Sequence, residues 1–127
     1  MRVELVSPER ILFSGDAEMV VCRTVDGGDI AFLSNHAPFL GALDIGAVKI
    51  KTNGDEEMAA VHGGFVHVRE DTVIVLSDVA ELADDIDVDR ARRAKEAAQR
   101  NAGDSEEKEA QAALRRAEVR LEVAGSR

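Results

Sequence analysis

Few side chains in this sequence have the type and spacing that catalysis or ligand binding requires. Cys22 is the only cysteine, so a disulfide framework is excluded and a reducing compartment is indicated. Its neighbours Val20, Val21, Arg23 and Thr24 predict a thiol buried in a strand, and the sequence offers no base that could activate it. The phosphate-binding pattern G-x-x-x-x-G-K-[ST] is absent from the sequence, so nucleotide hydrolysis is not expected.

Histidine and aspartate provide a second set of candidates. Asp29 and His36 could serve a small enzyme, but such a site needs a concave pocket with perturbed pKa values. From the residues alone, Asp29 is expected to close its turn and His36 to hydrogen-bond the backbone of its loop. His62 and His67 are five residues apart, so a regular strand would point them to opposite faces, and a metal pair is not expected. We therefore assign no catalytic residue and no metal site.

Charge divides the chain into an acidic part and a neutral part. The formal net charge is -9, and of 25 acidic and 16 basic residues, 15 acidic and 6 basic lie within residues 1–84. Residues 85–127 therefore carry no net charge. Because phosphate binding depends on basic groups, the acidic part argues against a nucleic-acid partner and against binding to anionic lipids. No apolar run approaches the roughly 20 residues of a spanning helix, so a soluble chain without direct membrane insertion is expected.

The texture of the sequence changes once, at Ala83–Asp89. Residues 1–84 consist of short β-branched runs separated by glycine turns at spacings of roughly 8–12 residues, which is typical of a β-sandwich. Residues 85–127 are rich in Ala, Arg, Glu and Lys and contain no proline or aromatic residue, which predicts helix. The fold class is therefore α+β: an antiparallel sandwich of about ten strands over 1–84, followed by an antiparallel two-helix hairpin over 85–127.

Turn signals divide the sandwich into its strands. Asn53-Gly54 predicts a two-residue hairpin turn, because this dipeptide tolerates the positive φ of such turns. Gly63-Gly64 is predicted to separate two strands, Glu57–His62 and Phe65–Val68. Alternation in Phe65–Val68 is strict, which predicts that one face of that strand is buried.

Capping residues set the ends of the predicted helices. Asp87 is a good N-cap for a first helix over residues 88 to about 101, which Gly103 can end in the left-handed conformation. Asp104 and Glu107 have capping-box spacing for a second helix reaching about residue 124.

Alanines recur at helical spacing on one face of each predicted helix. An alanine methyl buries little area, and burial contributes only about 25 cal/mol per Å². The hairpin is therefore expected to be held weakly and to be able to leave its resting place, as a switch would require. A static surface feature is the alternative interpretation.

Five segments follow one another in the order of a known family. They are S-P-E-R-I-L-F-S-G at residues 7–15, N-H-A-P-F-L-G-A-L-D-I-G-A-V-K-I at 35–50, H-G-G-F-V-H-V at 62–68, V-I-V-L-S-D at 73–78 and D-D-I-D-V-D-R-A at 84–91. In this combination they resemble the epsilon subunit of the bacterial F-type ATP synthase. The resemblance covers almost the whole chain.

The resemblance implies a non-catalytic subunit of the central stalk. The sandwich, residues 1–84, would sit on the gamma subunit and the c-ring, so that rotation of the ring passes into the catalytic head. The hairpin, residues 85–127, would be a regulatory arm that can extend along gamma toward the alpha and beta subunits and restrain ATP hydrolysis. The subunit would be peripheral, on the cytoplasmic face of the cell membrane, as part of the complex.

The resemblance also implies partner contacts on the sandwich. Asp29 falls where many relatives carry a glutamate that faces the polar loops of the c-ring, and His36 falls on the family's histidine near gamma. Pro38 closes the same loop. This chain has Ser34-Asn35 where relatives usually have Pro-Gly or Gly-Gly, and Ala31 where they have glycine. We therefore expect the fit of this loop to its partners to differ.

The segment I-D-V-D-R-A at residues 86–91 resembles the pattern I/L-D-x-x-R-A, by which some relatives bind one ATP against the folded-down hairpin. Arginines from two helices could clamp a triphosphate, and Asp87 could accept hydrogen bonds from adenine or a neighbouring amide. No cofactor is required in this interpretation, and ATP would be a regulatory ligand that favours the compact arm. Alternatively, Asp87 serves only as an N-cap, and the arginines lie on solvent-exposed helix faces without binding a ligand. The residues that the resemblance assigns to ATP are Glu81, Ile86, Asp87, Arg90, Ala91, Arg116 and Arg120.

Two other function classes compete with the stalk subunit. One is a free-standing interaction module that presents its helical hairpin to another protein, and the other is a small enzyme built on Asp29 and His36. A protein that only presents a hairpin would not need an acidic sandwich with the Asn35–Pro38 loop. The sequence therefore favours the stalk subunit.

Overall fold

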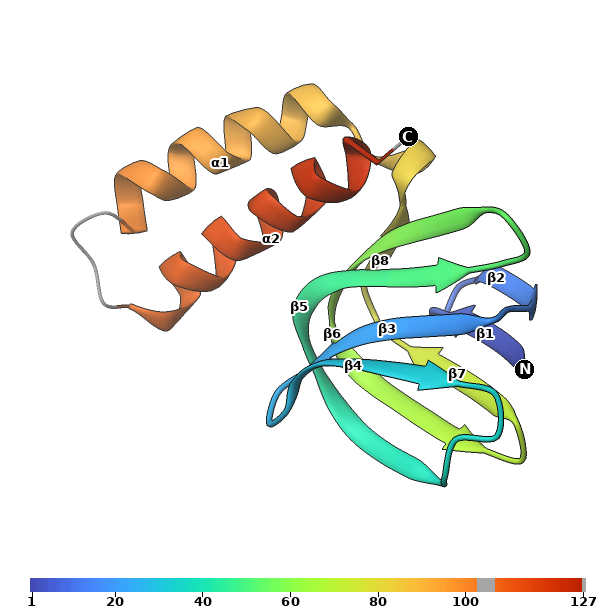
Figure 1. Cartoon of the computed structure of the whole chain (residues 1–127). Helices are drawn as coiled ribbons and strands as arrows, with labels where there is room; N and C mark the ends of the chain where they lie inside the picture. Colours follow the sequence, from blue (N-terminus) through green and yellow to red (C-terminus); the bar gives the residue numbers. More distant parts are fainter. Residues whose placement is uncertain (103–106, 127) are drawn as a thin grey trace.

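A sheet folded over on itself carries a pair of helices against one side (Figure 1). The structure, a computed structural model, describes residues 1–102 and 107–126, with only the backbone of Ala102. The strands are β1 Arg2–Val6, β2 Ile11–Asp16, β3 Met19–Thr24, β4 Gly28–Leu33, β5 Phe39–Lys51, β6 Glu56–Arg69, β7 Thr72–Leu76 and β8 Ala80–Leu82. A 3-10 helix, η1, spans Ala83–Asp85, and the α-helices are α1 Val88–Ala102 and α2 Lys108–Ala124.

The described strands form one sheet in the order β2-β1-β7-β6-β5-β3-β4, with β8 paired to β6. Neighbouring strands are antiparallel except β1 and β7, which are parallel with Val3 opposite Val73. β5 and β6 are 13 and 14 residues long, and Figure 1 shows that both bend strongly along their length. The bend brings the two halves of the sheet face to face, which makes the predicted sandwich.

The core lies between these two halves. Alternate residues of each strand point inward, so Val3 and Leu5 of β1 are fully buried while Glu4 between them is not. Phe32 of β4 is the largest of the fully buried side chains. Cys22 of β3 is also fully buried, as predicted, and burial raises the pKa of its thiol to about 12. The thiol therefore stays protonated and unreactive at neutral pH.

The α+β fold class is confirmed, but the prediction of about ten strands was wrong for the described residues, which hold eight. The segments predicted as two strands around Gly63-Gly64 are a single strand, β6. Gly63 and Gly64 have φ values of +88° and +124°, so they bend the chain inside the strand instead of ending it. Glycine adopts these angles without the steric cost that other residues meet.

The helical hairpin is confirmed, with one difference at a helix start. Asp87 caps α1 as predicted: its Oδ1 accepts a hydrogen bond of 3.1 Å from the backbone N–H of Arg90. α2 begins at Lys108, and Glu107 at its N-cap makes no side-chain cap hydrogen bond. Gly103 and Asp104, predicted to end the first helix and to cap the second, lie outside the described residues. The division into units 1–84 and 85–127 stays a prediction.

The hairpin rests on the sandwich through α2, which contacts β5, β6 and η1, whereas α1 packs mainly on α2. A small apolar cluster holds this contact, and Val123 of α2 is fully buried in it. The cluster consists of Met58, Ala60, Ile86, Val123 and Ala124, with Ala47, Ala83, Val88 and Val119 packed around it. More than half of these residues are alanine or valine, so the area buried per contact is small.

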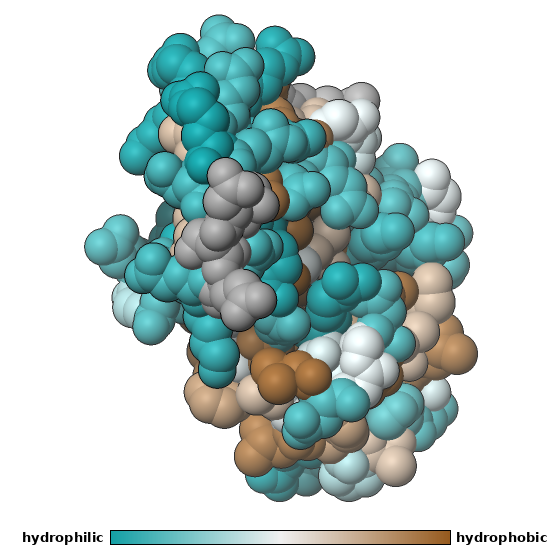
Figure 2. Space-filling view, turned by 90° about the vertical axis from the view of Figure 1, so that its left-hand side faces the viewer, coloured by the Kyte–Doolittle hydropathy of each residue, from teal (hydrophilic) through white to brown (hydrophobic). Residues whose placement is uncertain are grey.

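Alanines also form the contact between the helices. Ala91 and Ala98 of α1 and Ala117 of α2 are buried, whereas Ala94 of α1 is exposed. Figure 2 shows that the side of the hairpin turned to the viewer is hydrophilic, while hydrophobic side chains gather on the sandwich below it. No described helix is long and apolar enough to cross a membrane.

Candidate functional site

A pocket at the junction of sandwich and hairpin contains five of the seven residues assigned to ATP. They are Glu81 of β8, Asp87 at the start of α1, Arg90 and Ala91 of α1, and Arg120 of α2. The volume of the pocket is about 260 Å³. Asp85 and Ala94 complete its lining; neither was predicted, because neither stands in the recognised pattern.

The other two residues assigned to ATP lie outside this lining. Ile86 is buried and belongs to the apolar cluster that holds α2 against the sandwich. Arg116 lies one turn before Arg120 on α2, and its Nη2 donates a hydrogen bond of 2.6 Å to Glu109 Oε1. In this arrangement only Arg120 of the two α2 arginines faces the pocket.

Asp87 occupies the N-terminus of α1, where free backbone N–H groups favour a negative charge. Its Oδ1 caps the Arg90 N–H, and its backbone carbonyl accepts from the Ala91 N–H at 3.0 Å. The aspartate lines the pocket and is held in place by its structural role as the cap. Both interpretations of Asp87 are compatible with this geometry, because a carboxylate has a second oxygen that can accept a hydrogen bond.

Replacing Asp87 by alanine is expected to lower the free energy of unfolding by about 1 kcal/mol, because the N-cap hydrogen bond is lost. Asp87→Asn should cost much less, since asparagine caps helices as well as aspartate does. Urea unfolding of both variants would test this. Equal losses in the two variants would show that the negative charge, and not the cap, accounts for the stabilisation.

An ion pair joins α2 to the sandwich inside the pocket. Arg120 Nε donates to Glu81 Oε1 at 2.5 Å, and the two side chains are only 29% and 30% exposed. A second, more exposed pair connects Arg115 Nη1 of α2 with Asp44 Oδ2 of β5 at 3.9 Å. Charge-assisted hydrogen bonds in partly buried surroundings are stronger than neutral ones, so the Glu81–Arg120 pair is the main polar link between arm and sandwich.

His62 lies against this ion pair and was not predicted to be part of the site. Its side chain is 3% exposed, and its Nε2 is 3.7 Å from Glu81 Oε1. Burial and the nearby Arg120 charge lower the pKa of His62 to about 4, although Glu81 acts in the opposite direction. The imidazole is therefore neutral at physiological pH. No local pattern in the sequence could reveal this role, because the burial comes from α2.

The predicted partner residues Asp29, His36 and Pro38 lie away from this pocket, around β4. Asp29, opposite Arg23 of β3, accepts a 3.2 Å hydrogen bond from its Nε, and both side chains are more than half exposed. His36 follows the other end of β4, with its Nδ1 2.7 Å from the Ala37 carbonyl oxygen. Its ring meets the buried Phe32 ring edge-on at 5.0 Å.

This placement separates Asp29 from His36. A strand advances about 3.3 Å per residue, so the length of β4 from Asp29 to Leu33 alone keeps them roughly 13 Å apart. A catalytic pair built on these two residues is not supported. The bond of His36 to the Ala37 carbonyl matches the expectation of a loop-bonding histidine, whereas Asp29 pairs across strands with Arg23 and the bonds across the turn come from Thr24.

The outer face of the sheet carries a row of exposed apolar side chains that the sequence did not single out. Ile11 pairs with Val6, Val6 with Leu76, and Leu76 with Phe65 across four neighbouring strands. Ile11, Phe65 and Leu76 are each about half exposed or more. We call Val6, Ile11, Phe65 and Leu76 the outer apolar stripe. Contiguous exposed apolar patches often mark interaction surfaces, so the stripe is a candidate for one.

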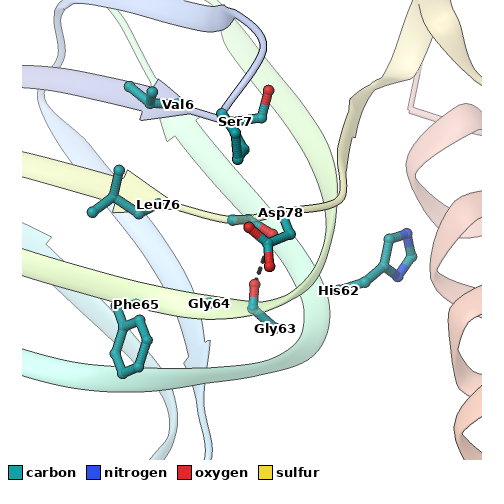
Figure 3. A pocket seen from close by; sticks show the side chains of 10 residues that line it. Val6, Ser7, His62, Gly63, Gly64, Phe65, Leu76 and Asp78 are labelled. Atoms are coloured by element: carbon teal, nitrogen blue, oxygen red, sulfur yellow. Dashed lines mark hydrogen bonds between the residues drawn. The ribbon is translucent and has the colours of Figure 1, made fainter.

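A second pocket, of about 290 Å³, opens beside this stripe at the Gly63-Gly64 bend (Figure 3). Ser77 is a buried residue of its lining, and its hydroxyl donates to the Gly63 carbonyl at 2.7 Å. His62 belongs to the lining through its backbone, since Figure 3 shows its imidazole pointing away toward the helix. The bend therefore lies between Phe65, which belongs to the outer apolar stripe, and His62, whose side chain points toward the helical hairpin.

Comparisons with known proteins match the chain along its length. A family model described as the ATP synthase delta/epsilon chain, beta-sandwich domain, matches residues 1–83, and one described as the long alpha-helix domain of that chain matches residues 84–125. An ATP synthase epsilon chain from Halalkalibacterium halodurans is 42% identical over 130 residues, covering 98% of this chain and 97% of that protein. One from Streptomyces griseus is 45% identical over 128 residues, covering 100% and 97%.

Solved structures with the same fold come from two mitochondrial assemblies. A chain of the Euglena gracilis ATP synthase structure aligns with a TM-score of 0.79 at 22% identity, covering 96% of this chain and 79% of that one. A chain of the Tetrahymena thermophila central stalk and c-ring structure aligns with a TM-score of 0.63 at 14% identity, covering 98% and 93%. At these identities the likeness concerns the fold.

Proposed function

The chain belongs to the epsilon subunits of ATP synthase, and from this premise we propose that it is a non-catalytic rotor subunit that restrains ATP hydrolysis. The sandwich couples rotation of the c-ring to the catalytic head, and the helical hairpin is the element that restrains hydrolysis. The subunit is peripheral, on the cytoplasmic face of the membrane, and it is held there by the complex.

The attachment of the hairpin is the observation that carries this proposal. α2 rests on the sandwich through one small apolar cluster and through two ion pairs, Glu81–Arg120 and Asp44–Arg115. Exposed ion pairs such as the second contribute only about 0–1 kcal/mol each. Because the contact is small and its polar links can be replaced by water, the arm can detach while the sandwich core, which lies elsewhere, stays intact.

Two surfaces of the sandwich are free for partners. The outer apolar stripe suits a stable protein partner, because burying exposed apolar side chains stabilises association. We assign it to gamma. His36 and Pro38 lie apart from it, in the β4–β5 loop, where the Asn35 N–H donates to Asp71 at the opposite end of β7 from Leu76. Asp29, at the opposite end of β4, is exposed and charged, which suits the polar loops of the c-ring. Its pairing with Arg23 means that a cationic group of the ring would have to compete with that arginine.

ATP is proposed as a regulatory ligand of the pocket between arm and sandwich. Arg90 and Arg120 offer guanidinium groups from two helices, and such groups bind phosphate oxygens bidentately. Three carboxylates line the same pocket, so the triphosphate must draw Arg120 away from Glu81. The ligand contacts both helices and the sandwich, and therefore it favours the docked arm over the detached one.

Reconstitution of epsilon-depleted ATP synthase with the full-length chain and with residues 1–87 tests the proposal. We expect both chains to bind stably and only the full-length chain to slow ATP hydrolysis. Circular dichroism and size exclusion of residues 1–87 control for folding, because the truncation uncovers Met58 and Ala60. Equal hydrolysis rates with the two chains would reject the inhibitory arm, and failure of both to bind would reject the stalk role.

A further inference from the structure

His62 is the buried ionisable group that the proposed function leaves unexplained. It lies on β6 where the strand passes under α2, and its imidazole points toward the helix (Figure 3). Only 3% of the side chain is exposed. Neither ring nitrogen has a hydrogen-bond partner within residues 1–102 and 107–126. Buried polar atoms are nearly always hydrogen-bonded, so two buried ring nitrogens without a partner call for an explanation. Their protonation is the property that we consider.

Charged groups face this imidazole from both elements packed against it. Glu81 of β8 places Oε1 at 3.7 Å from Nε2, which is longer than a hydrogen bond. Arg120 of α2 already donates to that same oxygen, and the charge of Arg116 also acts on the imidazole. A proton on His62 would thus place a cation beside two arginines, with the one nearby carboxylate oxygen already engaged.

From this geometry we propose that His62 is a proton-sensitive latch for the arm: α2 docks over the neutral imidazole, and protonation of the imidazole releases the helix. The inference rests on the proposed function only in requiring an arm that can detach. It goes beyond that function because it adds a second signal, pH, which acts from the sandwich side and without a nucleotide.

The direction of the pH effect follows from linkage. In the docked arm the pKa of His62 is about 4, whereas an exposed histidine titrates near 6.5. The detached state therefore binds the proton more tightly, so docking is strongest above about pH 6.5 and weakens as the pH falls toward 4. With these two pKa values, the docking equilibrium falls about tenfold between pH 7.5 and pH 5.5.

Thiol accessibility at Val123→Cys in the full-length chain measures this equilibrium. Val123 of α2 is fully buried in the apolar cluster between α2 and the sandwich, and valine to cysteine preserves most of its volume, so the thiol reacts only when the arm opens. A pyridyl disulfide, which reacts at both pH values, serves as the probe, with rates normalised to those of an unstructured cysteine peptide. Cys22 is fully buried in the sandwich core and reports global unfolding in the same experiment.

We expect the normalised opening at Val123→Cys to be about tenfold larger at pH 5.5 than at pH 7.5, with Cys22 unreactive. Adding His62→Gln, which cannot titrate, should abolish the pH dependence, whereas the matched variant His67→Gln on the same strand should keep it. Opening that is independent of pH, pH dependence that survives His62→Gln, or Cys22 reacting in step with Val123→Cys would each overturn the latch.

These outcomes are separate from the test of the proposed function. A chain whose arm opens with falling pH but does not slow hydrolysis would retain the latch and lose the inhibitory role. A chain that slows hydrolysis but opens equally at both pH values would retain the inhibitory role and lose the latch.

Discussion

Gly64→Ala is expected to lower the free energy of unfolding by more than about 3 kcal/mol, the upper range for a single strained backbone position. A Cβ at this position would lie 2.0 Å from the carbonyl oxygen of Leu76 and 3.0 Å from its carbonyl carbon. Both atoms are backbone, so they cannot move aside without separating β6 from β7. The φ of +124° adds a conformational cost that alanine cannot avoid. Urea or thermal unfolding of the purified chain measures the loss.

Gly54→Ala is the matched control for this prediction. Gly54 also has a positive φ, +91°, but a Cβ there would meet no atom within 4 Å. Its substitution should cost only the conformational part, about 1–2 kcal/mol. If the two variants lost equal stability, the contact with Leu76 would not be the reason that β6 needs glycine at its bend.

Arg120→Ala is expected to weaken ATP binding by roughly 30-fold or more, since a hydrogen bond between charged groups contributes about 2 kcal/mol. Arg120 is the one α2 arginine that lines the described pocket, and a triphosphate there would need its guanidinium. The loss also leaves Glu81 without its 2.5 Å partner, so that carboxylate would repel the phosphates. Isothermal titration calorimetry of the full-length chain with ATP measures the effect.

Arg115→Ala and Arg116→Ala are the controls for this substitution. Arg115 is also an α2 arginine paired with a carboxylate of the sandwich, Asp44, but it does not line the pocket. Its loss should leave ATP affinity nearly unchanged. Arg116→Ala distinguishes two expectations. The resemblance assigns Arg116 to ATP and predicts a loss of affinity, whereas the observed lining does not include it and predicts little change. Unchanged affinity in Arg120→Ala would remove the pocket from the ATP proposal and leave the family membership intact.

Much of the candidate site could be predicted from the sequence. Glu81, Asp87, Arg90, Ala91 and Arg120 were assigned from the resemblance, and they line one pocket. Asp87 was recognised independently as an N-cap because capping depends on a residue and the next three positions. Arg116 was assigned with equal weight, yet it bonds to Glu109 on its own helix. Residues four apart lie on the same face of a helix, so which of the two arginines lines the pocket depends on where each lies along α2 relative to the sandwich.

The two effectors proposed for the arm, ATP and a proton on His62, act in opposite directions on the contact between α2 and the sandwich. ATP would stabilise the docked arm by binding Arg90 and Arg120, whereas a proton on His62 would destabilise it. Glu81 is common to both, because it pairs with Arg120 and lies nearest to His62. A change at Glu81 should therefore alter both the response to ATP and the response to pH. A change at Arg90 should alter only the response to ATP, and a change at His62 only the response to pH.

The sequence by itself determined the features that depend on neighbouring residues. Alternation and turn residues predicted the sandwich, alanine-rich periodicity predicted the two helices, and the flanks of Cys22 predicted its burial. These patterns have periods of 2 and 3.6 residues, so they are readable within a short window.

Only the tertiary structure decided the features that depend on distant segments. The parallel pairing of β1 with β7 joins residues about 70 positions apart. The outer apolar stripe exists because four strands place one apolar residue each in register. Gly63 and Gly64 bend a strand instead of ending it because β5 pairs with β6 on both sides of them, while β8 pairs with β6 before the bend and β7 after it. His62 is buried and neutral because α2 lies over it, and no periodicity in its own strand encodes the helix that covers it.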